Sequence, residues 1–221
     1  MERDITISHV VDDEGSTTGG DGNDRDPLAR RAPVAALLLS GGASRRMGQD
    51  KTRLVHEGRT LAERTAHLLT LVVDVAIEIG PGHSGLESLE EEPSGEGPLA
   101  AIVAGRRALR QRGHDGSVLI LACDMPLLSE DFLRFLVAFE SSASVVPVVE
   151  GRLQPLCAKW GSADLDTAGR LYSRGERSLR FLATSPEVVL LSEPEWTTLA
   201  SRAMFTDVDT PDDARRLGLI T

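Results

Sequence analysis

The residues best suited to chemistry lie between positions 41 and 51, where three glycines, two arginines and a lysine follow a short apolar run. Glycines allow the backbone to approach a ligand closely and to turn successive N–H groups toward an anion. Arginine and lysine supply positive charge where negative charge must be held. The apolar run, residues 34–39, is typical of a buried strand of a parallel sheet. A strand that ends in such a loop predicts a phosphate-binding site, with a structural turn under a solvated basic patch as the alternative.

The loop differs from two common glycine-rich loops. A P-loop carries glycine directly before Lys-Ser/Thr, whereas Asp50 precedes Lys51 in this chain. The dinucleotide fingerprint Gly-x-Gly-x-x-Gly does not fit the spacing of Gly41, Gly42 and Gly48. A different kind of nucleotide loop is therefore expected.

Carboxylates follow at two later points of the chain. Asp124 comes shortly after the apolar run 118–122, a predicted buried strand, and an acid there is well placed to hold a cation in a ligand crevice. The alternative for Asp124 is a turn-forming role before Pro126. Asp207 and Asp209 lie two residues apart in a segment that is predicted to be extended, so both should point to the same face and Asp209 could join Asp124 on Mg²⁺. The alternative is that residues 209–211 cap a terminal helix.

No nucleophilic triad is evident. The five histidines are scattered, and most are expected at the surface: His9, His56, His67, His83 and His114. A transfer between phosphates needs no nucleophilic side chain, because a phosphate acceptor is already ionised at neutral pH.

The elements that must position these residues alternate between strands and helices. This alternation predicts an α/β fold of three layers, with a mainly parallel twisted sheet and helices on both faces, as in Rossmann-like proteins. The predicted strands are 34–39, 72–79, 118–122, 144–149, 153–160 (antiparallel) and 187–191, with 205–208 as a short extended piece. The predicted helices are 60–71, 99–109, 129–139, 162–172, 178–182 and 211–217, and a long acidic connection fills 80–97.

Composition sets the broad class. The chain has 221 residues, of which 41% are hydrophobic and 26% charged, and this favours one α/β domain, assigned to residues 31–221. Residues 1–30 are rich in Gly, Asp, Ser and Thr and predict a disordered acidic tail. The net charge of −10 argues against nucleic acid partners, and no apolar stretch predicts a membrane span or leader. Two cysteines in apolar runs, Cys123 and Cys157, predict buried free thiols and a cytoplasmic protein.

Residues 39–51 resemble the N-terminal motif of the molybdenum cofactor guanylyltransferase family, Leu-Ala-Gly-Gly-x-Ser-x-Arg-Met-Gly-x-Asp-Lys, and differ from it only at Ser40. Later segments resemble the family in the expected order, so that the similarity spans about residues 32–221. They are Gly97-Pro98-Leu99-Ala100, Cys123-Asp124-Met125-Pro126-Leu127, Gly175-Glu176-Arg177 and Asp207-Val208-Asp209-Thr210-Pro211.

The resemblance implies transfer of GMP from GTP to the phosphate of molybdenum-carrying molybdopterin, with Mg²⁺ as cofactor. It implies catalytic roles for Arg45, Lys51 and Asp124 and a metal role for Asp124, which Asp209 could share. The implied nucleotide-binding residues are Leu39, Ser40, Gly41, Gly42, Arg46, Gly48, Lys51 and Asp124. Gln154 and Arg177 are expected on the acceptor side, with a solvated loop as the alternative for Arg177. Transient contacts with molybdenum cofactor synthesis proteins or recipient molybdoenzymes are also expected.

The chain departs from the family in several places. The family more often has Asn at positions 207 and 209, an aspartate upstream of Gly97-Pro98, an asparagine after the second strand, and His-Pro where this chain has Gln154-Pro155. Gly41-Gly42 and Asp50 favour guanine by similarity, whereas residues 207–211 are reminiscent of the cytidylyl branch. The alternatives are therefore a molybdopterin cytidylyltransferase, another small-molecule nucleotidyltransferase, or a non-catalytic nucleotide-binding protein in cofactor delivery.

Overall fold

The computed structural model describes residues 33–41, 50–90, 95–139 and 142–220. All of them belong to one compact unit, Ala32–Thr221. The predicted tail 1–30 lies outside the described residues.

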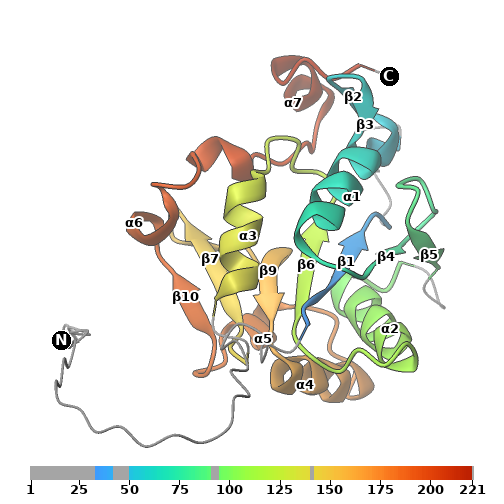
Figure 1. Cartoon of the computed structure of the whole chain (residues 1–221), viewed down its shortest axis with the longest axis vertical. Coiled ribbons are helices and arrows are strands. Elements are labelled where there is room, and N and C mark those ends of the chain that lie inside the picture. Colours follow the sequence, from blue (N-terminus) through green and yellow to red (C-terminus); the bar gives the residue numbers. More distant parts are fainter. Residues whose placement is uncertain (1–32, 42–49, 91–94, 140–141, 221) are drawn as a thin grey trace, which may run out of the picture. The chain divides into compact units, whose positions relative to one another are not determined.

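The centre of this unit is a mixed sheet of eight strands (Figure 1). Its order is β10-β7-β9-β6-β1-β4-β5, and β8 pairs with β7. β1 pairs in parallel with both β4 and β6, whereas β9 runs antiparallel to β6 and β7. The strands of the sheet are β1 (Ala35–Leu39), β4 (Ala76–Ile79), β5 (Glu87–Leu89), β6 (Val118–Ala122), β7 (Val145–Val149), β8 (Arg152–Leu153), β9 (Cys157–Trp160) and β10 (Val189–Leu191). The predicted α/β class and mainly parallel sheet are confirmed.

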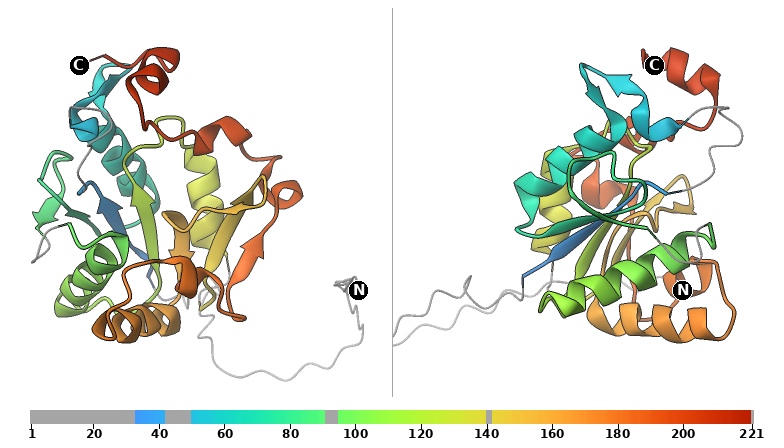
Figure 2. Two further views of the ribbon diagram at one scale, coloured as in Figure 1. Left: turned by 180° about the vertical axis from the view of Figure 1, so that it is seen from behind. Right: turned by 90° about the vertical axis from the view of Figure 1, so that its right-hand side faces the viewer.

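Helices cover both faces of the sheet (Figure 2). The alternation of side chains along β1 divides the core, because Leu37 and Leu39 face one layer and Ala36 and Leu38 face the other. The first layer holds α2 (Pro98–Gln111), α4 (Ser162–Ser173) and α5 (Arg180–Ala183). The second holds α1 (Leu61–Val72), α3 (Glu130–Ala138) and α6 (Glu193–Trp196).

A small third cluster joins the region around residues 54–61 to the C-terminal part of the described chain. It packs the hairpin of β2 (Val55–His56) and β3 (Arg59–Thr60) against α7 (Pro211–Arg216), through Leu54, Leu61, Val208 and Ala214. The backbone of Ile220 also exchanges hydrogen bonds with Val55. This contact places the segment after the glycine-rich loop beside the last helix.

Local sequence signals set the helix ends as predicted. Ser129 caps α3, Pro98 opens α2, and Thr210 begins α7 with a capping box closed by Asp213. Thr60 and Glu63 form a second capping box at α1. Two short 3₁₀ helices, η2 (Lys51–Arg53) and η3 (Arg202–Phe205), flank the candidate site in sequence.

Four predictions about elements were wrong in their bounds or their content. The strand expected at 72–79 begins only at Ala76, because α1 continues to Val72 and Val73 ends it by donating its N–H to Leu69. The connection 80–97 contains β5, which its polar sequence did not predict and which forms by parallel pairing with β4. The expected strand 153–160 is divided into β8 and β9, and the expected extended piece 205–208 begins after η3.

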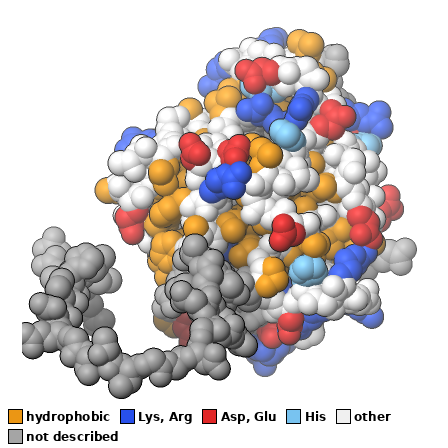
Figure 3. All heavy atoms as spheres, viewed as in Figure 1, with side chains coloured by type: hydrophobic (Ala, Val, Ile, Leu, Met, Phe, Trp, Pro, Cys, Tyr) orange, Lys and Arg blue, Asp and Glu red, His pale blue; other side chains and the backbone are white. Residues whose placement is uncertain are grey.

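The charges on the surface are mixed where α1 and α3 face the viewer (Figure 3). Acidic and basic side chains lie among apolar and neutral ones there. In the described part of the chain, no helix is both long and apolar enough to cross a membrane.

Candidate active site

Three charged side chains from distant parts of the sequence meet beyond the carboxyl ends of β1 and β6. The Nζ of Lys51 lies 2.5 Å from an Asp209 carboxylate oxygen and 3.7 Å from one of Asp124. Lys51 and Asp124 are largely buried, with 16% and 27% of their side chains exposed. Asp124 and Asp209, which were predicted to share a cation, thus both lie close to the ammonium group of Lys51.

Backbone hydrogen bonds fix this meeting point. β1 and β6 are adjacent parallel strands, and the N–H of Cys123 continues their pairing by donating to the Leu39 carbonyl. The N–H of Val208 then donates to the carbonyl of Asp124. The segment that carries Asp207 and Asp209 is thus attached to the end of the central strand.

The local field makes these carboxylates unusual. Burial raises the pKa of Asp124 above its ordinary value, although the Lys51 ammonium opposes the shift. Burial, together with the charges of Asp124 and Asp209, raises the pKa of Asp207 to about 6. A cluster of carboxylates that resists full ionisation is a place where added positive charge is favourable.

The end of β1 approaches the next strand closely. The N–H groups of Ser40 and Gly41 both donate to the Ile79 carbonyl. Gly80 has a φ of +151°, and a Cβ there would overlap the Ser40 hydroxyl and the Gly41 nitrogen. The asparagine that the family carries after the second strand has no room at Gly80.

Sequence reasoning missed Glu78, a buried carboxylate beside this approach. It is 0% exposed and accepts hydrogen bonds from the hydroxyls of Ser40 and Ser84 and from the amides of Gly82, His83 and Ser84. Burial acts to raise the pKa of Glu78, but these donors lower it below the ordinary value. The only signal in the sequence was an acid inside an apolar strand, with small polar residues shortly after it.

The same loop supports the segment that carries Lys51. The His83 ring lies 2.8 Å from the Thr52 hydroxyl, 3.1 Å from an Arg53 guanidinium nitrogen and 3.2 Å from an Asp50 carboxylate oxygen. Asp50 also caps η2 by accepting from the amide and hydroxyl of Thr52. Glu78 therefore holds Ser40 at the end of β1, and His83 holds the residues on either side of Lys51.

Beside the carboxylates lies a polar cavity of about 520 Å³. It is lined by Gln154, Asp207, Arg152, Glu150 and Arg202, among others. Gln154 is held by its backbone, whose N–H donates to the Pro147 carbonyl and whose carbonyl accepts from Cys157. The structure thus brings Gln154 to the side of the site that Asp207 faces.

Arg177 lies elsewhere among the described residues. Its guanidinium stacks 4.4 Å from the centre of the Tyr172 ring and lies 3.4 Å from a Glu96 carboxylate oxygen. Its carbonyl oxygen lies near Gly97, the residue before α2. Arg177 does not line the cavity beside Gln154, and its acceptor role stays a prediction.

Three of the predicted nucleotide-binding residues, Gly42, Arg46 and Gly48, fall outside the described residues, as does Arg45, which was predicted to be catalytic. Leu39 and Ser40 are buried at the end of β1, and Gly41 is exposed just beyond them. Both cysteines are buried free thiols, as predicted, and burial raises the pKa of each.

Comparison of the sequence with models of known protein families identifies the family of this chain. The model of the MobA-like NTP transferase domain matches residues 36–188. The chain belongs to this family. It is therefore a nucleotidyltransferase, and the matched residues include β1, the glycine-rich loop, Lys51 and Asp124.

Curated relatives extend the similarity over almost their whole length. A probable molybdenum cofactor guanylyltransferase of Mycobacterium avium is 32% identical over 199 residues, which cover 86% of this chain and 98% of that protein. One of Opitutus terrae is 34% identical over 181 residues, covering 76% of this chain and 89% of that protein.

Solved structures share the fold. Molybdopterin-guanine dinucleotide biosynthesis protein A from Archaeoglobus fulgidus superposes with a TM-score of 0.68 at 22% identity, covering 83% of this chain and 96% of that one. A nucleotidyl transferase from Methanothermobacter thermautotrophicus gives a TM-score of 0.62 at 18% identity, covering 84% and 95%.

Proposed function

We propose that this nucleotidyltransferase transfers GMP from GTP to the phosphate of molybdenum-carrying molybdopterin, forming molybdopterin guanine dinucleotide and pyrophosphate. The observation that carries the proposal is the meeting of Lys51, Asp124 and Asp209 at the end of the glycine-rich loop motif. The names of the relatives, which are guanylyltransferases at 32–34% identity, support the choice of donor and acceptor.

The reaction itself asks for charge stabilisation and positioning. An oxygen of the acceptor phosphate attacks the α-phosphorus of GTP. The bond between that phosphorus and the oxygen that bridges the α- and β-phosphates breaks. Pyrophosphate leaves with the electron pair of this bond. Lys51 supplies a fixed positive charge near the reacting phosphates, where negative charge develops in the transition state.

The residues present suit Mg²⁺, which commonly binds through one or two carboxylates and substrate phosphates. Asp124 and Asp209 contact the same ammonium group, so their oxygens already converge. Burial raises the pKa of Asp124 and of Asp207, so a bound cation would stabilise the charged forms of these carboxylates. Among the described residues, no group of three or more His, Cys, Asp or Glu side chains is arranged so that it could hold a metal ion by itself. Bound Mg²⁺ would neutralise phosphate charge during the transfer, with Asp124 and Asp209 as its protein ligands.

The nucleotide and the acceptor would enter from different sides. We place the guanine near Leu39, Ser40 and Gly41 at the end of β1, a segment whose backbone is fixed because the N–H groups of Ser40 and Gly41 donate to the Ile79 carbonyl. The cavity beside Asp207 offers Arg152, Arg202 and Gln154 to an anionic acceptor. We assign the acceptor to this cavity and the nucleotide to the β1 side.

A nucleotide panel tests the function directly. Purified protein is incubated with Mg²⁺, molybdenum-loaded molybdopterin and GTP, CTP, ATP or UTP, and pyrophosphate is followed. We expect turnover with GTP alone. Preference for CTP would move the protein to the cytidylyl branch, and nucleotide binding without pyrophosphate would contradict the enzymatic proposal.

A further inference from the structure

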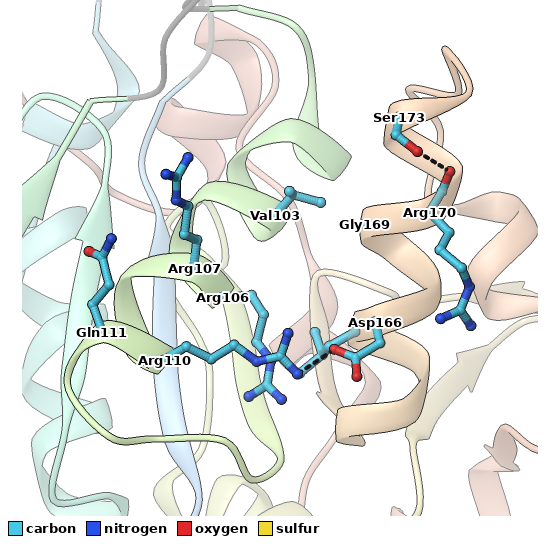
Figure 4. A pocket seen from close by; sticks show the side chains of 10 residues that line it. Val103, Arg106, Arg107, Arg110, Gln111, Asp166, Gly169, Arg170 and Ser173 are labelled. Carbon is cyan, nitrogen blue, oxygen red and sulfur yellow. Dashed lines mark hydrogen bonds and ion pairs between the residues drawn. The ribbon is translucent and has the colours of Figure 1, made fainter.

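A second concave surface lies between α2 and α4, on the outer side of the first helix layer (Figure 4). It has a volume of about 780 Å³ and shares no lining residue with the cavity beside Asp207. Its lining includes four arginines, Arg106, Arg107 and Arg110 from α2 and Arg170 from α4. We call this surface the α2–α4 groove.

The charges in the groove are only partly balanced. Arg106 and Arg110 both contact the Asp115 carboxylate at 2.6 Å, and Arg110 also bridges to Asp166 on α4 at 2.7 Å. Arg107 and Arg170 are exposed, and neither forms an ion pair with another of the described residues. Four arginines against two aspartates leave the groove with a charge of about +2, in a chain whose net charge is −10.

A buried polar group in the groove also lacks a partner. Arg106 is 4% exposed and donates to the backbone of His114, Asp115 and Gly116 through its terminal nitrogens. Its Nε is buried without a hydrogen-bond partner among the described residues. A buried unsatisfied N–H calls for an explanation.

Gly169 on α4 lines the groove and has no role in the packing of its own chain. A Cβ added there would meet no atom within 4 Å, and its φ is not in the left-handed region. Glycine inside a helix costs about 1 kcal/mol relative to alanine. A glycine that the fold does not require leaves space on the helix surface for an approaching side chain.

The groove suits recognition by side chains rather than by backbone. Phosphate sites that are built from backbone amides use helix N-termini and glycine-rich turns, whereas the lining residues here lie inside helices whose amides are already bonded. Val103, Leu165 and Gly169 form an apolar floor between the arginines. We propose that the α2–α4 groove docks an amphipathic, acidic helix of a partner protein, with carboxylates on Arg107 and Arg170 and an apolar side chain against Gly169.

Site-specific photocrosslinking tests the proposal with the full-length chain. A benzoylphenylalanine replaces Gln111, which lines the groove, and the protein is irradiated in the cells from which the sequence comes. We expect a crosslinked protein whose crosslinked peptide, sequenced by mass spectrometry, carries Asp or Glu at helical spacing. The crosslink yield should fall at least tenfold in Arg107→Glu/Arg170→Glu and in Gly169→Leu.

A matched control separates the groove from net charge. Arg59→Glu/Arg180→Glu makes the same charge change at exposed residues outside the groove and should keep the crosslink. The groove variants should melt no lower than the wild type, Gly169→Leu equally or higher because leucine favours a helix over glycine, and all should keep nucleotidyl transfer. A crosslink only to nucleic acid, to a small molecule or to a second copy of this chain would overturn the proposal, as would no crosslink or equal yields in all variants.

Discussion

At the scale of single residues, the pKa values of two carboxylates near the site, Asp124 and Glu78, are shifted in opposite directions. Burial raises the pKa of Asp124, so its charged form is costly without a cation. Glu78 is fully buried, yet the donors around it lower its pKa. We therefore expect Asp124 to bind the metal and phosphates proposed above, whereas Glu78 stabilises the folded chain through its hydrogen bonds.

Asp124→Asn should remove activity without unfolding the protein. The substitution keeps the size of the side chain and removes a charge that burial disfavours, so the melting temperature should stay equal or rise. Loss of a charged group at the reacting phosphates should lower the turnover rate about 100-fold or more. Pyrophosphate release and thermal melting measure both effects.

The exposed Asp74 provides the control for that variant. Asp74→Asn makes the same chemical change at a bend outside the site and should leave the turnover rate unchanged. An Asp124→Asn protein with normal turnover would refute the assignment of Asp124 to the metal and the phosphates.

Glu78→Gln should destabilise the chain by about 3 kcal/mol at pH 7, because the buried donors lose their charged acceptor. The lowered pKa means that Glu78 stabilises the folded state above its unfolded pKa of about 4.5, and that this contribution is lost as the pH falls through the lower folded value. The stability difference between wild type and variant should therefore shrink below about pH 4.5.

Denaturant unfolding between pH 3.5 and 8 checks this dependence. Glu187→Gln, at an exposed position, is the matched control and should change stability by less than about 0.5 kcal/mol at every pH. A difference that is constant with pH would show that the charge of Glu78 is not what holds the 82–84 turn.

At the scale of elements, two glycines in neighbouring helices, Gly105 and Gly169, differ in whether the packing of the chain leaves room for a side chain. A Cβ on Gly105 of α2 would lie 2.5 Å from the side chain of Leu37 on β1, whereas a Cβ on Gly169 of α4 would meet nothing within 4 Å. The first glycine allows α2 to pack on the central strand. The second is not needed for packing within the chain.

The same substitution should thus change stability in opposite directions. Gly105→Ala should destabilise by about 1–3 kcal/mol through overpacking against Leu37. Gly169→Ala should stabilise by about 0.5–1 kcal/mol through helix propensity. Thermal or denaturant unfolding of the two variants, each serving as the control for the other, decides this. A shift of the same sign in both would contradict the packing described for α2.

The elements that sequence patterns predicted are those that local chemistry determines. Apolar runs predicted β1 and β6, and caps such as Thr210 predicted helix starts. β5 was missed because Glu87-Ser88-Leu89 has almost no apolar signal and becomes a strand only beside β4. The start of the strand predicted at 72–79 was placed four residues too early because Val72, Val73 and Val75 are β-branched and favour a strand locally, whereas β4 begins only at Ala76.

At the scale of the whole molecule, the sequence predicted that Asp209 could join Asp124, but it predicted neither their contacts with Lys51 nor the residues that support this cluster. Glu78 lies in an apolar strand, and only the fold shows that its carboxylate faces the turn at 82–84. The role of His83 likewise depends on a contact with Thr52 across the structure. Sequence spacing cannot reveal such pairings.

Removal of residues 1–28 should leave the turnover rate unchanged. This segment carries eight acids and two arginines, a charge of −6 (−8 + 2), and the family match begins only at residue 36. Steady-state kinetics of the shortened and full-length proteins at equal concentration test this. A loss of more than about tenfold in turnover would show that the acidic segment takes part in catalysis or folding.

The hydrogen bond between Val208 and Asp124 can form only late in protein synthesis, because Val208 lies near the end of the described chain. Asp209 follows Lys51 by 158 positions, and the Val55–Ile220 pairing forms later still along the chain. A ribosome-bound nascent chain can complete most of the sheet while the lysine still lacks this carboxylate partner. We therefore expect chains truncated before residue 207 to contain all the strands of the sheet but to lack the carboxylates of Asp207 and Asp209.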